Sequence, residues 1–176
     1  AWGLDDARPE LRAIAPECDA ATRWVSASSP HIGAHWLACA GTPALLFTEN
    51  ESNGERLWGV PNRTPYVKDG IGEAIVHGAT GATNPEGVGT KMAAHYALTL
   101  VSGATETVLL RLATQHHDAP FAGADDLFAR RQAEADSFFS RFGADQLTED
   151  ARLVQRQGFA GLLWSKQHYD YNVRLW

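Results

Sequence analysis

The sequence predicts an α+β fold in which an antiparallel β portion is followed by two α-helices. Residues 22–48 form short runs of β-branched and aromatic residues separated by Ser-Ser-Pro and Gly-Thr-Pro, which is typical of strands joined by turns. Residues 91–114 contain two further runs in which apolar and polar residues alternate. After Pro120 the apolar spacing lengthens from two residues to about 3.6, the period of a helix.

The chain is expected to enter its β portion after an irregular start. Residues 1–20 are rich in Pro, Ala and acidic side chains, which indicates an irregular lead-in. Strands are then expected in TRWVSAS, HIGAHWLACA and PALLFTE. Residues 48–90 look like a loop, but a structureless loop of that length is unusual in a compact domain. We therefore expect its apolar residues to hold it in place, with a short strand near AIVHG.

The strongest β signal lies in KMAAHYALTLVSGATETVLLRLAT. Every second residue from Met92 to Leu100 is apolar or aromatic, and the pattern returns from Val108 to Leu112. Ser-Gly-Ala-Thr between the two runs is suited to a turn. The pattern predicts an antiparallel hairpin with one buried face.

Two helices are expected in the last third of the chain. The first covers about 123–142 and carries an apolar stripe, with Gly143 as its stop. The second covers about 148–171 and begins at Thr148, a good N-cap residue. Its stretch FAGLLW is apolar on every side, which is typical of a helix buried among other helices. One preceding helix cannot bury it, so we expect further helical partners.

Composition excludes several classes of function. The net charge of −6 argues against a nucleic-acid binder, which needs a basic surface. No run approaches the ~20 apolar residues of a membrane span, so we expect no membrane insertion and a cytoplasmic location. No phosphate-binding, dinucleotide or zinc motif occurs, so we expect no cofactor and no metal-binding residues among these 176. Cys18 and Cys39 are compatible with a disulfide or with two buried thiols, and their small number favours thiols.

Two stretches carry residues suited to ligand binding. In FTENESNGERLWGVPNRTPYVKDG, charged residues surround Trp58 and Tyr66, so this stretch is either a functional loop or a solvated loop with surface ion pairs. In GLLWSKQHYDYNVRLW, aromatic rings alternate with ammonium, amide and hydroxyl groups. Such groups suit a sugar, whose C–H faces need an aromatic plane and whose hydroxyls need hydrogen bonds. The alternative is a core helix whose Tyr and Lys tips lie at the rim.

Three stretches carry a family resemblance. LLFTENESNGERLWGVPNRTPYVKDGI, NPEGVGTKMAAHY and LLWSKQHYDYNVRLW, in that order, resemble the bacterial glucosidase-like proteins of glycoside hydrolase family 63, and the resemblance covers most of residues 43–176. It implies an N-terminal β-sandwich, a linker helix and an (α/α)6 barrel. Residues 21–117 would then be a β-sandwich portion, and residues 118–176 would be the linker helix plus the first barrel helix.

The resemblance also implies an activity. The family hydrolyses glycosidic bonds with inversion, using a carboxylic acid and a carboxylate about 6.5–9.5 Å apart. Both come from later barrel segments, so no catalytic residue is carried over and residues 1–176 alone should be inactive. The expected partners are a carbohydrate substrate and the remainder of the barrel. The expected substrate-binding residues are Glu55, Arg56, Trp58, Trp164, Lys166, Gln167, Tyr169 and Tyr171. The alternative is a free-standing, non-catalytic β-rich module that binds carbohydrate or protein and carries a helical tail.

Overall fold

The computed structural model spans residues 1–176 and describes residues 8–15, 21–143 and 146–166. The chain divides into two compact units, Ala1–Ala122 and Gly123–Trp176, which are described separately. The first unit holds antiparallel sheets and short helices, and the second holds two long helices. The predicted α+β class is therefore confirmed.

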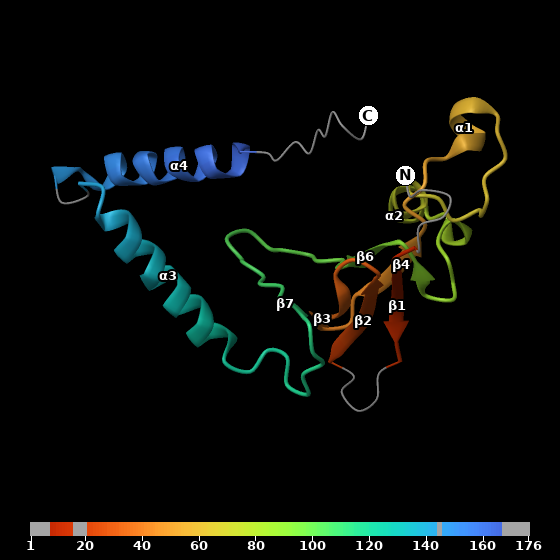
Figure 1. The fold of residues 1–176 in the computed structure, drawn as a ribbon, viewed down its shortest axis with the longest axis horizontal. Helices are drawn as coiled ribbons and strands as arrows, with labels where there is room; N and C mark the ends of the chain where they lie inside the picture. The colour runs from red at the N-terminus through yellow and green to blue at the C-terminus, as the bar shows by residue number, and fades with distance from the viewer. Residues whose placement is uncertain (1–7, 16–20, 144–145, 167–176) are drawn as a thin grey trace. The chain divides into compact units, whose positions relative to one another are not determined.

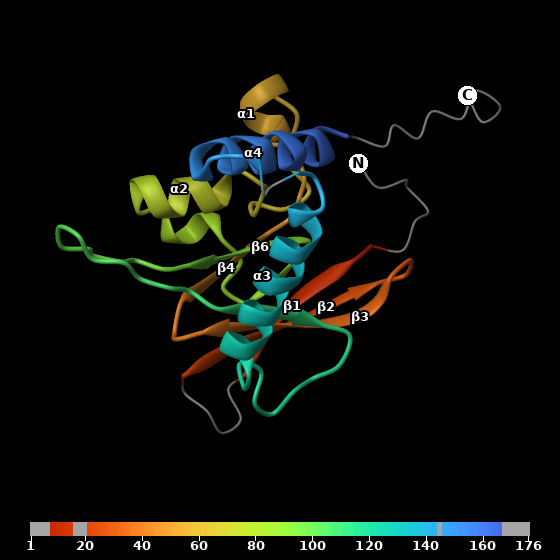
Figure 2. The same cartoon turned by 90° about the vertical axis from the view of Figure 1, so that its left-hand side faces the viewer.

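The larger sheet of the first unit has five strands in the order β5-β1-β2-β3-β7. Every neighbouring pair is antiparallel, and β1, β2 and β3 lie side by side in both views (Figures 1 and 2). The strands are β1 (Glu10–Ile14), β2 (Thr22–Ser29), β3 (Gly33–Ala40), β5 (Val88–Gly89) and β7 (Leu110–Ala113). Strand β1 corrects the expectation that residues 1–20 form an irregular lead-in. Its residues, ELRAI, pair with β2 on one side and with β5 on the other. Neither partner strand can be recognised from the local sequence.

A second sheet consists of β4 (Ala44–Thr48) and β6 (Lys91–His95). This pairing shows that the predicted hairpin is wrong, because β6 pairs with β4 while β7 pairs with β3. Residues 96–109, between the two strands, contain a turn but no strand. Alternation marks which face of a strand is apolar, but it does not say which strand will be the neighbour.

Alternate residues of the larger sheet share one face, which we call the inner face. The register places Val25 opposite Leu37, and Leu37 opposite Leu112, so these three side chains lie on it. Cys39 lies two residues along β3 from Leu37 and shares the same face. Val25 and Cys39 are fully buried, so the core of the first unit lies against this part of the inner face.

The two-stranded sheet contributes Phe47 to this core. Phe47 is completely buried, and Gly87 lies between its ring and the Ala13 side chain of β1. At the other side of the core, the Tyr96 hydroxyl donates a hydrogen bond to the Ala40 carbonyl oxygen over 2.8 Å. Strand β4 therefore lies towards β1, and the chain leaving β6 lies towards β3.

The opposite face of the larger sheet is crossed by the chain that follows β7. The Trp24 and His116 rings have centroids 4.2 Å apart. Arg111 donates to the Pro120 carbonyl oxygen over 3.0 Å and lies 3.1 Å from His117 Nε2. Both histidines thus have packing or hydrogen-bonding roles on this face.

Three short helices lie between β4 and β5: α1 (Gly54–Trp58), α2 (Gly70–His77) and the 3-10 helix η1 (Thr80–Ala82). The strand expected near AIVHG is wrong, since residues 74–77 form the second half of α2. Gly78, with φ +67°, ends the helix, and the Gly70 backbone packs closely on η1. These tertiary contacts outweigh the strand preference of Ile75 and Val76.

The second unit confirms both predicted helices, α3 (Ala124–Ser140) and α4 (Glu149–Ser165). Thr148 caps α4 as expected, because its hydroxyl accepts a hydrogen bond from the Ala151 amide over 3.2 Å. Phe138, Phe142 and Phe159 pack together between the helices. Helix α4 ends at Ser165 and not near residue 171 as expected, since the next residue has an extended backbone.

No helix within the described residues is both long enough and apolar enough to span a membrane. Cys39 is a free, buried thiol, whereas Cys18 lies outside the described residues.

Candidate functional site

Residues 49–69 form a well-connected loop that contains α1, and we call it the α1 loop. Its two ends run beside each other, because the Glu49 amide donates to the Tyr66 carbonyl oxygen over 2.8 Å and the Lys68 amide donates to the Glu51 carbonyl oxygen over 3.0 Å. The Lys68 ammonium also donates to the Ser52 hydroxyl over 2.9 Å. The loop is thus closed at its base, and α1 projects away from the sheets (Figures 1 and 2).

Two asparagines hold the start of α1. Asn53 is its N-cap and accepts from the Arg56 amide over 3.0 Å. Asn62 Oδ1 accepts from the Gly54 amide over 2.8 Å, and Asn62 Nδ2 donates to Asn53 Oδ1 over 3.0 Å. A five-residue helix is too short to be stable by itself, so these side chains determine whether α1 forms.

A glycine ends α1 directly after Trp58. Gly59 has φ +67°, and its amide donates to the Glu55 carbonyl oxygen over 3.1 Å. The first bond is that of the usual left-handed helix end, and the Val60 amide adds a further bond to the Gly54 carbonyl oxygen over 3.3 Å. Trp58 is therefore held at the last position of a helix that is capped at both ends.

Arg56 connects α1 to the start of α2. Its Nη1 lies 3.3 Å from Asp69 Oδ2 and 3.5 Å from Glu73 Oε1, while Asn53 Nδ2 donates to Asp69 Oδ2 over 3.1 Å. These groups are partly exposed, and exposed ion pairs typically contribute only about 0–1 kcal/mol each to stability. Their main consequence is orientation: the guanidinium and two carboxylates stay beside α1.

The α1 loop exposes a cluster of apolar side chains. Trp58 is 67% exposed, and Leu57 and Val60 beside it are also exposed. Glu55 is exposed and, among the described residues, has no ion-pair partner. The structure therefore brings together three predicted binding residues, Glu55, Arg56 and Trp58, on one short helix. An indole held outward by a polar network favours the functional-loop hypothesis over that of a merely solvated loop.

Sequence reasoning missed the residues that attach the loop base to the sheets. Arg8 forms ion pairs with Glu49 and Glu51. The Thr90 hydroxyl donates to Glu49 Oε2 over 2.8 Å and accepts from the Asn50 amide over 2.8 Å. Thr90 and Arg8 are about 40 residues from their partners in the chain, so no local motif could have indicated them.

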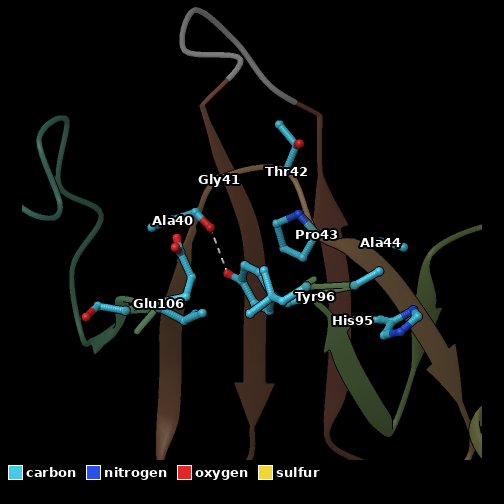
Figure 3. A pocket seen from close by; sticks show the side chains of 12 residues that line it. Ala40, Gly41, Thr42, Pro43, Ala44, His95, Tyr96 and Glu106 are labelled. Carbon is cyan, nitrogen blue, oxygen red and sulfur yellow. Dashed lines mark hydrogen bonds between the residues drawn. The ribbon is translucent and has the colours of Figure 1, made fainter. Parts of the chain in front are cut away.

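A pocket of about 510 Å³, which we call the Tyr96 pocket, lies at the edge of the two sheets (Figure 3). Tyr96 and Pro43 lie near its centre, with Glu106 and His95 on opposite sides. The pocket is lined by Ala40, Gly41, Thr42, Pro43, Ala44, His95, Tyr96, Ala97, Leu98, Glu106, Thr107 and Val108. Sequence reasoning missed it because it forms where the β3–β4 connection meets two parts of the β6–β7 connection.

Two neighbouring groups at this pocket, the Cys39 thiol and the Tyr96 hydroxyl, have raised pKa values. Burial raises the pKa of the Cys39 thiol, although its hydrogen bond with Tyr96 lowers it in part. Burial, followed by the interactions with Cys39, raises the pKa of Tyr96. A catalytic thiol requires a lowered pKa, so Cys39 is unsuited to nucleophilic attack. The Tyr96 pocket has the chemistry of a binding or packing surface.

The remaining predicted binding residues belong to the second unit. Trp164, at the end of α4, is 87% exposed, and Lys166 directly after the helix is exposed. Gln167, Tyr169 and Tyr171 lie outside the described residues. Within the part of the chain that the structure describes, no group of three His, Cys, Asp or Glu side chains is arranged to hold a metal ion.

Comparison with known proteins identifies a long relative. An uncharacterized protein of Saccharomyces cerevisiae is 36% identical over 146 residues, a stretch that covers 76% of this chain and 13% of the yeast protein. The chain thus spans a small part of that relative's length. No protein-family profile matches the chain. No solved structure matches it either.

Proposed function

We propose that residues 1–176 are a segment of an inverting glycoside hydrolase of the family 63 type, acting on glucosides or related α-linked sugars. The observation that carries the proposal is Trp58, an exposed indole fixed on a capped helix beside Arg56. An indole face can stack on the C–H face of a pyranose, and guanidinium and carboxylate groups can hydrogen-bond its hydroxyls. The choice of family 63 rests on the sequence resemblance of three stretches of this chain to that family.

The exposed surface of α4 supports the proposed architecture. Helix α4 has no buried residue, and its exposed apolar side chains are Leu153, Val154, Leu162, Leu163 and Trp164. A helix that is apolar on several sides normally packs among other helices. In the proposal, α4 is the first helix of an (α/α)6 barrel, α3 is the linker, and the two antiparallel sheets belong to a β-sandwich. The general acid and base then lie outside residues 1–176.

The proposal is tested by hydrolysis with the full natural polypeptide that carries this sequence. We expect release of the sugar from α-glucosides with inversion, so that proton NMR detects the β-anomer first. Trp58→Ala should lower kcat/KM by about tenfold or more, because a stacking contact of ~1.4 kcal/mol corresponds to a factor of ten. Leu57→Ala is the matched control, since Leu57 is a similarly exposed neighbour. No hydrolysis of any glycoside would overturn the proposal, and equal losses in both variants would remove Trp58 from the site.

The α4 end of the proposed site has its own test. Lys166 follows α4 with an extended backbone and an exposed side chain. Lys166→Ala should lower kcat/KM in the same polypeptide, because its ammonium donates hydrogen bonds to sugar hydroxyls in the proposal. Arg152→Ala, at an exposed position near the other end of α4, serves as the control. Unchanged kinetics for Lys166→Ala would exclude Lys166 from the pocket.

A second candidate is a free-standing carbohydrate-binding module. It is favoured by one observation: the α1 loop with Trp58 lies entirely within the first compact unit. This candidate predicts that the 176-residue chain binds soluble gluco-oligosaccharides, measured by calorimetry, and that Trp58→Ala abolishes the binding. Binding by this chain without hydrolysis by the full polypeptide would favour the module over the enzyme.

A further inference from the structure

The inner face of the five-stranded sheet is covered only in part. The two-stranded sheet lies against its β1–β2 side, where Phe47, Val25 and Cys39 are fully buried. Strand β4 is nearest to β5, since the Thr90 amide after β5 donates to the Thr48 carbonyl oxygen over 3.1 Å. The chain leaving β6 reaches β3 through Tyr96. The remaining part of the inner face, along β3 and β7, lies beyond the last described strand of the smaller sheet.

Leucines mark this uncovered strip. Leu112 lies opposite Leu37, and Leu110 lies opposite Cys39, so both belong to the inner face. Yet Leu112 is 65% exposed and Leu110 is 56% exposed. Strand β7 is also the edge of its sheet, and among the described strands only β3 pairs with it. Natural proteins normally protect an apolar edge strand with charges, prolines or a covering segment.

A buried nitrogen lies at one end of the same strip. His35 is opposite Ala27 and two residues from Leu37, so it too lies on the inner face. Its Nδ1 atom is buried and has no hydrogen-bond partner within the described residues. The His35 residue lines an apolar pocket of about 140 Å³ together with Ile32 and Leu112. An unsatisfied buried polar atom costs about 1–3 kcal/mol, so this position calls for a polar partner.

The Tyr96 pocket lies at the other end of the strip. The Ala40 amide donates to the Leu109 carbonyl oxygen over 3.0 Å, which places the pocket wall beside the start of β7. Leu98 and Val108, which also line the pocket, are exposed. Two pockets, the leucines of β7 and an unpartnered imidazole nitrogen therefore follow one line along the β3–β7 half of the inner face.

We propose that this half of the inner face is the docking surface for a further β-strand, contributed by a longer polypeptide that contains residues 1–176. The strand would lie beside β6, extend the two-stranded sheet across β3 and β7, and carry alternating apolar residues that cover Leu110 and Leu112. One of its polar groups would hydrogen-bond His35 Nδ1. Strand addition to an open edge supplies backbone hydrogen bonds, and alternate side chains fill pockets.

The length of the relative argues for this source of the strand. The aligned 146 residues make up 13% of the yeast protein, so a related polypeptide has ample further chain. A second copy of residues 1–176 is a weaker occupant. In a dimer formed through this strip, the strip of one copy would lie against the same strip of the other copy. Each His35 Nδ1 atom would then face the other copy's His35, whose Nδ1 atom also lacks a hydrogen-bond partner within the described residues. The proposal concerns the fold of the β portion and does not depend on the proposed hydrolase activity.

Cysteine accessibility tests the docking surface. Leu112→Cys is placed in the 176-residue chain and in the full natural polypeptide, and alkylation of each cysteine by N-ethylmaleimide is followed by mass spectrometry. In the 176-residue chain, Cys at 112 should react at a rate close to that of Val76→Cys, an exposed benchmark on α2. In the full polypeptide it should react at least tenfold more slowly. Native Cys39, which is completely buried, reports on folding in every sample because it stays unreactive while the core is intact.

Two outcomes would overturn the proposal. Equal reactivity at position 112 in both proteins, with Cys39 protected, would show that no segment covers the strip. Protection that appears in the 176-residue chain and grows with its concentration would assign the strip to a second copy. If Leu112→Cys exposes Cys39, Leu110→Cys replaces it, since Leu110 lies on the same strip. Hydrolase activity is not measured, so failure here is distinct from failure of the proposed function.

Discussion

At the scale of single residues, close backbone packing explains several glycines that no motif accounts for. Gly70 is buried at the start of α2, and a β-carbon added there would lie 2.2 Å from the Ala82 carbonyl oxygen. Such a distance is far below van der Waals contact, so either α2 or η1 must shift. Gly72, two residues later in the same helix, has nothing within 4 Å of its added β-carbon. Substitutions at these two glycines therefore distinguish the effect of close packing on stability from the effect of helix propensity.

We predict opposite effects of alanine at these two positions. Gly70→Ala should destabilise the first unit by about 1–3 kcal/mol, because it overpacks a rigid contact. Gly72→Ala should stabilise it by about 0.5–1 kcal/mol, because alanine is the better helix former. Urea unfolding followed by circular dichroism measures both values. Loss of stability at Gly72, or none at Gly70, would contradict the described packing of α2 on η1.

The Cys39–Tyr96 pair predicts how stability depends on pH. Burial raises the pKa of Cys39 above its ordinary value of 9.0 and that of Tyr96 above 10.0. The folded state therefore holds these protons more tightly than the unfolded chain does. Their contribution is fully present below pH 9 and is lost as the pH rises through and above 9 to 10, because the unfolded chain ionises first.

We accordingly expect the Tm of the first unit to fall between pH 8.5 and 11. The Tm of the Tyr96→Phe variant should fall less steeply at the upper end of this range, since phenylalanine cannot ionise. The Tm of the Cys39→Ala variant should fall less steeply near pH 9, since alanine has no thiol to ionise. Differential scanning calorimetry at matched ionic strength provides the measurement. If both variants keep the slope of the parent chain, the alkaline loss comes from other groups.

At the scale of elements, α1 depends on side chains more than on helix propensity. Asn53 caps its N-terminus, accepts from Asn62 and donates to Asp69, so three contacts meet at one side chain. Glu55, two residues later, has no ion-pair partner among the described residues. The α1 loop is therefore rigid because of two asparagines rather than because of its own hydrogen-bonded turns.

We predict that Asn53→Ala loosens α1 and speeds tryptic cleavage after Arg56 by about tenfold. Loss of an N-cap costs about 1 kcal/mol. Loss of the Asn53 contacts with Asn62 and Asp69 brings the decrease in the local free energy of unfolding to about 1.4 kcal/mol, which corresponds to a tenfold larger population of the open, cleavable loop. Glu55→Ala is the control, and its cleavage rate should stay close to that of the parent. Equal rates in all three proteins would show that the caps do not limit opening.

The elements also show what a sequence can and cannot predict. Helices α3 and α4 were predicted because their signals are local: an apolar period, Thr148 as N-cap and a glycine beyond the first helix. The pairing of β6 with β4 was missed because partner choice depends on the whole sheet. Glu55, Arg56 and Trp58 were predicted as one group because they lie close together in a stretch that mixes charged and aromatic residues, but the helix that carries them was not predicted. The Tyr96 pocket and the role of Thr90 were missed because their parts lie 40 or more residues apart.

At the scale of the whole molecule, the chain has two units with different degrees of burial. The first unit contains both sheets, the α1 loop and every fully buried large side chain among the described residues. The second has no buried residue in either α3 or α4. A core stabilises a unit chiefly through apolar burial, so the first unit should carry most of the stability of this chain.

We therefore predict that residues 1–122, made as a separate chain, fold without the helices. The core around Phe47, Val25 and Cys39 comes entirely from within this range, as do the partners of every sheet strand. Its Tm should lie within a few degrees of that of the 176-residue chain, because α3 and α4 have no buried residue and so contribute little apolar burial. Circular dichroism provides the measurement, and protection of Cys39 from N-ethylmaleimide reports on the core. A chain of residues 1–122 that is unfolded, with a reactive Cys39, would show that α3 and α4 are needed to complete the first unit.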